Sequence, residues 1–358
     1  MRSRVHDVTR LGMPMLINRR SVLQLGSCAA AYAALGGSSR GDTLTGTVGY
    51  PGVNLAGGEF GTGNRLNWDY VYPTEKQVAY YASRGFKLLR IPFKSSRLIV
   101  NNVANMVDIN ILKTVIAAAG KRGMTVVLDM HEFALRPDGQ PLNDLDAAAF
   151  RRKWRVIAPQ FRIFPNVWFG LMNEPNQQTP EQWFRLANAG IAGIREVAPQ
   201  HTITVMGSRW GSADGWIASG NAAAVPMLSD PSNKLVIEMH QYLDNAGGNT
   251  TMSAVAGLAA NGLEAATTWA REKGWKLFLG EFASTADPAY LDETRTLLRY
   301  MYSNSDVWIA YACWAGGLWW AEGRSNYAYS IEPGSLDNPV DRPQMLMLRE
   351  FTQPAPAI

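Results

Sequence analysis

Apolar residues recur along this chain in short runs that alternate with longer amphipathic segments. Eight of the runs are rich in Val, Ile and Leu and lack strict polar alternation, which is typical of parallel strands covered on both faces. They span residues 47–57, 86–93, 125–131, 167–175, 202–210, 235–242, 276–283 and 307–317.

Segments with the spacing of amphipathic helices separate these runs. Thr74 and Thr179 stand where helix N-caps are expected, and Pro180 suits the first turn of the helix that follows. The predicted helices span residues 74–85, 108–123, 145–161, 179–197, 253–274, 289–303 and 342–351, and a weaker one covers 213–224.

Eight strand–helix alternations predict an α/β protein with a (β/α)8 TIM barrel as a single domain. A length of 358 residues with 47% hydrophobic residues provides ample material for such a core. A doubly wound open sheet is the alternative. It usually has a phosphate-binding loop after its first strand, but "GVNLAGGEFGTGN" (52–64) contains no GxGxxG and does not run straight into a helix.

Polar groups stand at the ends of six predicted strands. In a barrel, the C-terminal strand ends meet at one mouth, where the functional site forms. A single histidine at a strand end is more often structural, but six such ends together are hard to explain as packing. The residues are Arg90, His131, Asn173, Glu174, His240, Tyr242, Glu281 and Trp314.

Two of these residues, Glu174 and Glu281, suggest a reaction. They end the fourth and seventh predicted strands, which face each other across a barrel. Retaining glycoside hydrolysis needs two carboxyl groups roughly 5–5.5 Å apart, one as acid/base and one as nucleophile. The pair therefore indicates a glycosidase.

Five motifs resemble those of glycoside hydrolase family 5, a family of retaining β-glycanases with cellulases at its centre. The resemblance covers residues 48–322 in the expected strand order. The motifs are "RIPF" (90–93), "LMNEP" (171–175), "HQY" (240–242), "GEF" (280–282) and "WAGGLWW" (314–320).

The resemblance implies roles for the residues of these motifs. Glu174 corresponds to the acid/base, Glu281 to the nucleophile, and Asn173 to the amide that binds the sugar 2-hydroxyl. One position departs from the family, which commonly has His-Asn where this chain has His131-Glu132. Glu132 either turns away from the site or alters which sugar hydroxyls are accepted, so the departure affects substrate identity and not reaction class.

The remaining motif residues are implied to support the catalytic pair. Arg90 and Tyr242 correspond to residues that hold the nucleophile, and His131 and His240 to residues that order the site near the acid/base. Trp314 corresponds to the floor of the −1 sugar subsite.

Twelve tryptophans exceed what a core usually needs, and extended carbohydrate sites use flat indole rings as stacking platforms. Five of them lie in predicted loops or just after strands, where either core packing or sugar stacking explains them. They are Trp68, Trp210, Trp216, Trp319 and Trp320, of which all but Trp216 are candidate platforms.

The first 40 residues differ in charge from the rest of the chain. They hold six arginines and one aspartate, and subtracting this balance of +5 from the net charge of +4 leaves −1 for residues 41–358. A near-neutral body argues against nucleic acid as a partner, despite a pI near 9.0.

Within this leader, "NRRSVLQLG" (18–26) places Arg19 and Arg20 before an apolar run, which resembles a twin-arginine export signal. A core helix is the alternative. We predict a removable leader over residues 1–40 and a catalytic domain over 41–358. "LGSC" (25–28) also resembles a lipoprotein box, so stable membrane association is expected only if Cys28 is lipidated. Cys313, the other cysteine, is expected to pack as a small apolar residue.

The sequence thus predicts an exported, monomeric, retaining endo-β-1,4-glucanase that acts on β-linked polysaccharide without a cofactor. No His, Cys or Asp cluster has metal-ligand spacing. A β-mannanase or β-1,3-glucanase of the same family is the alternative activity, and a non-catalytic carbohydrate-binding barrel is a further alternative from another class.

The leader gives a first test. A chain that starts near Gly41 should fold and be active. Arg19→Lys combined with Arg20→Lys should block export in a host with the twin-arginine pathway, measured as the fraction of protein outside the cytoplasm. Unimpaired export of the double variant would contradict the pathway assignment.

Overall fold

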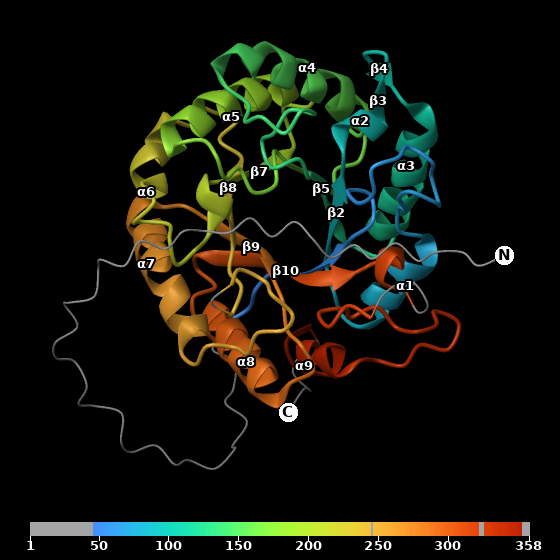
Figure 1. Cartoon of the computed structure of the whole chain (residues 1–358), viewed down its shortest axis with the longest axis vertical. Coiled ribbons are helices and arrows are strands. Elements are labelled where there is room, and N and C mark those ends of the chain that lie inside the picture. Colours follow the sequence, from blue (N-terminus) through green and yellow to red (C-terminus); the bar gives the residue numbers. More distant parts are fainter. Residues whose placement is uncertain (1–45, 245, 322–325, 353–358) are drawn as a thin grey trace. The chain divides into compact units, whose positions relative to one another are not determined.

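The computed structural model describes residues 46–244, 246–321 and 326–352. Eight parallel strands form a closed barrel in the order β1-β10-β9-β8-β7-β6-β5-β2 (Figure 1). The predicted barrel is therefore confirmed. The strands are β1 (Tyr50–Leu55), β2 (Leu88–Phe93), β5 (Thr125–Met130), β6 (Val167–Gly170), β7 (Thr202–Met206), β8 (Leu235–His240), β9 (Leu277–Phe282) and β10 (Trp308–Gly316).

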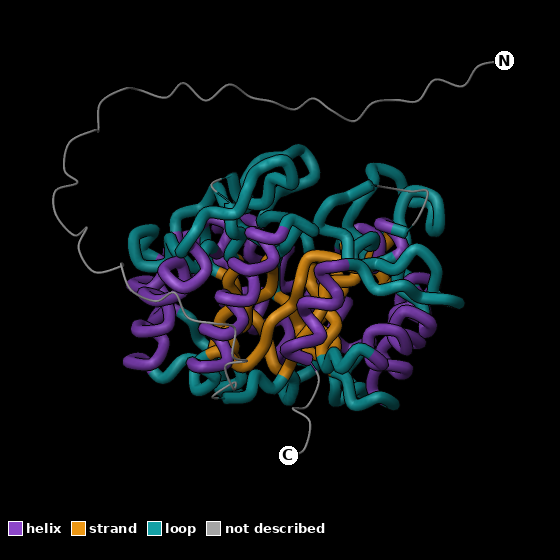
Figure 2. Tube along the Cα trace, turned by 90° about the horizontal axis from the view of Figure 1, so that it is seen from below, coloured by secondary structure: helices purple, strands orange, loops and turns teal. Residues whose placement is uncertain are grey.

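Seven of the predicted helices form and pack around the strands (Figure 2). Thr74 and Thr179 each make a capping box, and Pro180 occupies the first turn of α5. These helices are α1 (Glu75–Ser83), α3 (Met106–Gly120), α4 (Ala147–Ile157), α5 (Pro180–Arg195), α7 (Leu258–Lys273), α8 (Pro288–Ser303) and α9 (Pro343–Thr352).

Two local expectations were wrong. The stretch 213–224 is mostly turns, with only α6 (Asn221–Ala224) helical. β6 ends at Gly170, earlier than its apolar run, so Asn173 and Glu174 lie beyond the strand. Helix α2 (Ser95–Leu98) and the hairpin of β3 (Ile99–Val100) and β4 (Val103–Ala104) lie in a stretch to which the sequence analysis assigned no element.

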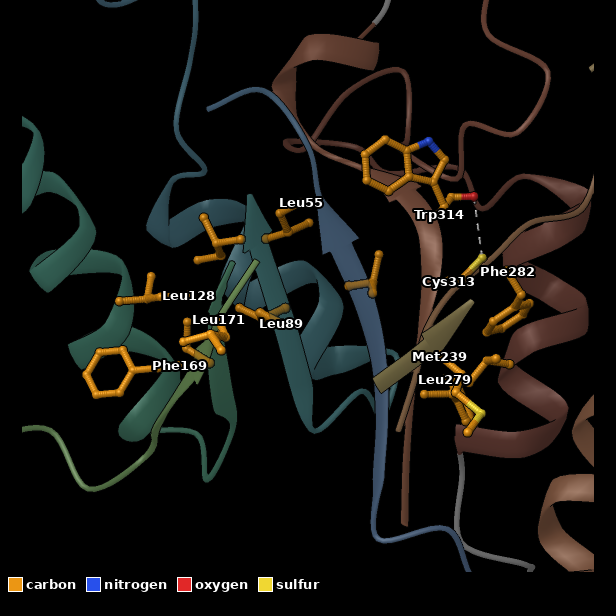
Figure 3. Packing of buried hydrophobic residues seen from close by; sticks show 14 of the residues in the cluster. Leu55, Leu89, Leu128, Phe169, Leu171, Met239, Leu279, Phe282, Cys313 and Trp314 are labelled. Carbon is orange, nitrogen blue, oxygen red and sulfur yellow. Dashed lines mark hydrogen bonds between the residues drawn. The ribbon is translucent and has the colours of Figure 1, made fainter. Parts of the chain in front are cut away.

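The outward faces of the strands pack against the helices. Leu89, Leu128, Phe169 and Leu279 lie in this layer and are fully buried (Figure 3). Cys313 lies there too, buried and with a free thiol, so its predicted role as a small apolar residue is confirmed.

The inward faces form two layers inside the barrel. A separate apolar cluster that includes Leu88, Val127 and Val236 lies near the N-terminal ends of the strands. Because strand side chains alternate in direction, the residue two positions further along faces the same interior. Those residues are Arg90, Asp129 and Glu238, so a charged layer lies above the apolar one.

The leader, including Arg19, Arg20 and Cys28, lies outside the described residues. Within the described ranges, no helix is long and apolar enough to cross a membrane.

Candidate active site

The residues predicted at six strand ends meet at one end of the barrel, in a connected set of polar contacts. Trp314 joins them through its ring, which stacks on His131 with 5.8 Å between the ring centroids. The set consists of Arg90, His131, Asn173, Glu174, His240, Tyr242, Glu281 and Trp314.

Arg90 is fully buried and forms ion pairs with three carboxylates. Its nitrogens lie 3.2 Å from Asp129 Oδ2, 2.9 Å from Glu238 Oε1 and 2.9 Å from Glu281 Oε1. Burial alone would lower the pKa of Arg90, but the charges of Asp129, Glu238 and Glu281 raise it above its ordinary value. The guanidinium is therefore a permanent positive charge beneath the site.

Two residues fix the carboxylate of Glu281. Arg90 Nη1 donates to Oε1 at 2.9 Å, and the Tyr242 hydroxyl donates to Oε2 at 2.8 Å. Burial and the charge of Glu281 raise the pKa of Tyr242 well above its usual value, so its hydroxyl keeps the proton that it donates. Both supporting contacts expected from the family resemblance are present.

Glu174 lies just beyond β6, with a backbone φ of +42° and a side chain that is 16% exposed. Its Oε1 lies 2.7 Å from His240 Nδ1. The same nitrogen lies 3.6 Å from Glu281 Oε2, so the imidazole bridges the two glutamates.

The ring of His240 is charged near neutral pH. Burial disfavours this charge, but Glu281 and the hydrogen bond to Glu174 more than offset it and raise the pKa to about 9. The positive His240 ring therefore stabilises a negative charge on Glu174 or on Glu281.

Glu174, His240 and Glu281 each place one ligand atom within 4.8 Å of the other two. The sequence spacing did not indicate this group, because its three residues are far apart in the chain and are brought together only by the fold. The charged His240 ring and the adjacent Arg90 both oppose a cation at this point.

His131 lies next to Asn173, the residue that precedes Glu174. It contacts Asp129 through Nδ1 at 2.8 Å and Asn173 Nδ2 through Nε2 at 3.1 Å, and none of its described contacts is with Glu174. Asn173 Oδ1 in turn accepts from Arg90 at 2.7 Å. His131 therefore orients the amide of Asn173, while among the described residues the side chain that bonds the Glu174 carboxylate is His240.

Glu132 contacts residues away from the catalytic pair. Oε1 accepts from the backbone N–H and the hydroxyl of Ser95, both at 2.7 Å, and Oε2 accepts from Lys153 Nζ at 2.9 Å. The carboxylate thus joins α2 to α4 and turns away from the catalytic pair.

The tryptophans divide between surface and core. Trp68 and Trp210 are 74% and 52% exposed, and the backbone N–H of Trp210 bonds to Pro175 O beside Glu174. By contrast, Trp216 is fully buried against Trp269, so it is a core residue.

The two tryptophans after β10 are both packed by other aromatic rings. Trp319 is half-buried and stacks on Phe60, with 5.1 Å between centroids. Trp320 is buried and stacks on Tyr327 at 4.1 Å. Trp320 is thus more enclosed than Trp68 and Trp210, and its interpretation as a platform stays a prediction.

Sequence reasoning missed three supporting residues. Asn54 accepts from Arg90 at 2.9 Å, Glu238 pairs with Arg90, and Tyr327 accepts from the Trp314 indole at 3.1 Å. Arg90 and His240 lower the pKa of Glu238 to about 2 against the effect of burial. Asn54 and Glu238 each interrupt an apolar strand, and that interruption was the available signal.

The comparisons with known proteins agree with one another. The family model described as cellulase (glycosyl hydrolase family 5) matches residues 50–317. Endoglucanase gh5-1 of Neurospora crassa is 34% identical over 302 residues, which cover 82% of this chain and 75% of that protein. Endo-β-1,4-glucanase B of Aspergillus niger is 28% identical over 320 residues, covering 88% and 94%.

Solved structures are similar over most of the barrel. The XacCel5A structure in complex with cellopentaose is 34% identical, with a TM-score of 0.78, and the match covers 85% of this chain and 99% of that one. The endoglucanase Cel5A of Pseudomonas stutzeri in complex with cellobiose is 30% identical, with a TM-score of 0.76, covering 87% and 95%.

The charge on His240 predicts a pH dependence of stability. Because its folded pKa of about 9 exceeds the ordinary 6.5, its contribution is fully present below pH 6.5 and is lost as pH rises through about 9. We expect the Tm of the wild type to exceed that of His240→Asn most at pH 6, and the difference to shrink by pH 10. A Tm difference that stays constant between these pH values would contradict the charged ring.

Proposed function

The chain belongs to glycosyl hydrolase family 5, the cellulase family, and we propose that it is a retaining endo-β-1,4-glucanase with Glu281 as nucleophile and Glu174 as acid/base. The observation that carries the mechanism is the separation of the two carboxylates, whose nearest oxygens lie within 4.8 Å. Retaining enzymes need roughly 5–5.5 Å between the carboxyl groups, whereas inverting enzymes need roughly 6.5–9.5 Å to admit a water molecule.

The surroundings of Glu281 suit a nucleophile. Arg90 and Tyr242 hold its two oxygens, so the carboxylate is charged and fixed in direction. In the first step a Glu281 oxygen bonds to the anomeric carbon while the glycosidic C–O bond breaks. The leaving oxygen takes a proton from Glu174.

The surroundings of Glu174 suit a group that first gives and then takes a proton. Its side chain is partly exposed at the mouth, where a leaving glucan and then water can reach it. In the second step Glu174 takes a proton from water, the water oxygen bonds to the anomeric carbon, and Glu281 leaves. The charged His240 ring stabilises Glu174 while it is ionised between the two steps.

The choice of β-1,4-glucan rests on the relatives. Those of Neurospora crassa and Aspergillus niger are named endoglucanase and endo-β-1,4-glucanase, and XacCel5A is solved with cellopentaose. Glu132, the one departure from the family motif, is engaged by Ser95 and Lys153 and leaves the catalytic pair unchanged.

We also propose that Trp314 floors the −1 subsite and that Trp210 is a stacking platform next to the acid/base. The exposed ring of Trp210 and its backbone bond to Pro175 support that place. Residues 1–40 would direct export by the twin-arginine pathway, and residues 41–358 would act as a monomeric catalytic domain.

Removing the nucleophile tests the role of Glu281. Glu281→Ala should lower kcat on cellotetraose by at least about a thousandfold. Arg90 retains Asp129 and Glu238 as partners, so the fold should persist. Azide should restore turnover of an activated aryl cellobioside by forming the α-glycosyl azide in the vacated space. Glu264→Ala, on the exposed face of α7, is the control and should keep full activity. Near-normal hydrolysis by Glu281→Ala would refute its assignment.

The acid role of Glu174 predicts a dependence on the leaving group. Glu174→Gln should greatly slow glycosylation by cellotetraose, whose alcohol leaving group needs a proton. A dinitrophenyl cellobioside needs little protonation, so its glycosylation rate, measured as the burst of phenolate, should be largely spared. Equal losses on both substrates would show that Glu174 is not the acid.

A further inference from the structure

A pocket of about 1320 Å³ adjoins the catalytic centre. Its inner end is formed by Glu59 and His131, and its walls are formed by α2, the β3–β4 hairpin, the loop after β5 and one face of α4. Neither Glu174 nor Glu281 lines it. The pocket therefore leaves the site on the side of β2 and β5, away from the line between the two catalytic carboxylates.

The pocket carries an excess of positive charge. Six cations line it against two carboxyl groups, Glu59 and Glu132, although residues 41–358 together carry a net charge of −1. All six cations lie outside the basic leader, so the excess of positive charge belongs to the pocket itself. The cations are Lys94, Arg97, Arg136, Arg152, Lys153 and Arg155.

Three of these cations are neutralised within the protein. Arg136 pairs with Asp146, Lys153 with Glu132 and Arg155 with Glu196, each at 2.9 Å. The three cations that lack such an ion pair are Lys94, Arg97 and Arg152.

None of the other three pairs with a carboxylate among the described residues, although Arg97 is itself buried and stacks over the ring of Tyr70. Lys94 donates to Gly61 O at 2.7 Å, and Arg97 donates to backbone carbonyls that include Gly58 O. Arg152 is exposed and has no ion-pair partner among the described residues. The pocket consequently has a net positive potential that suits an anion.

At the inner end of the pocket, one oxygen of the Glu59 carboxyl group lacks a hydrogen-bond donor among the described residues. Glu59 is 5% exposed, and its Oε2 accepts from Gly57 N at 2.7 Å, whereas Oε1 is buried without a partner among the described residues. Burial raises the pKa of Glu59 to about 7. A sugar hydroxyl would satisfy such an oxygen, since buried polar atoms are rarely left unpaired.

Between the two ends, apolar side chains line the walls. Phe60, Phe133, Leu135 and Val156 are among them. Aromatic and aliphatic surfaces suit the C–H faces of sugars. The volume exceeds the roughly 300–1,000 Å³ typical of small-molecule sites, so there is room for a substituted sugar unit.

We propose that this pocket binds a carboxylated side group of the glucan chain, so that the protein acts preferentially on acidic β-glucans. The proposal rests on the proposed glucanase function. A side group on the sugar that contacts His131 enters past Glu59, and its carboxylate lies among the unneutralised cations.

The test compares two soluble celluloses with the same degree of substitution, carboxymethylcellulose and hydroxyethylcellulose, which differ in the charge of the side group. Arg152→Glu reverses the charge of an exposed residue and should not affect folding. Lys121→Glu makes the same change at the opposite end of the barrel, where α3 leads into β5, and is the control.

At low ionic strength, Arg152→Glu should lower kcat/KM on carboxymethylcellulose roughly three- to tenfold and leave that on hydroxyethylcellulose unchanged. Lys121→Glu should change neither. Because the Debye length falls to about 10 Å at 0.1 M salt, raising the salt should reduce the wild-type preference for the charged polymer.

Equal effects of Arg152→Glu on both polymers, or no effect on either, would overturn the side-group site while the glucanase function stood. A wild-type preference for carboxymethylcellulose that added salt does not reduce would also overturn it. Failure of the wild type to cleave either polymer would instead refute the proposed glucanase function on which the site rests.

Discussion

The buried positive charge of Arg90 constrains the whole upper half of the barrel. Taking a guanidinium out of water costs several kcal/mol unless carboxylates and hydrogen-bond acceptors surround it. Here those partners are Asp129, Glu238 and Glu281, together with the side-chain oxygens of Asn54 and Asn173. They come from different parts of the barrel, so the strands must close in one register for all of them to reach Arg90.

This arrangement also sets the chemistry at the mouth. Glu281 is held by Arg90 and Tyr242. Among the described residues, the carboxylate of Glu174 is bonded by His240 alone, and its side chain is partly exposed. Two carboxyl groups of the same chemical type therefore meet different surroundings. One is fixed and charged, as a nucleophile requires, and the other can exchange protons with substrate and solvent.

The elements that follow the strands form the proposed side-group pocket, which would add selectivity for substrate side groups to the catalytic centre. The catalytic contacts lie at the strand ends, whereas the cationic pocket is built by α2, the β3–β4 hairpin and α4. Glu132 links the pocket to the catalytic centre, because it follows His131 directly and joins Ser95 to Lys153.

The sequence by itself determined the eight strands, seven of the helices and the residues at the strand ends, because each depends on local periodicity and on one rule about where barrel strands finish. It did not determine which polar groups inside the strands face one another. Asn54 and Glu238 were missed, and the sequence did not show that His131 would act through the amide of Asn173. The burial of Trp216 and Trp320 was likewise decided by tertiary packing. Periodicity gives the direction of a side chain from its own strand, but its partners depend on the closure and register of the barrel, which bring together residues far apart in the chain.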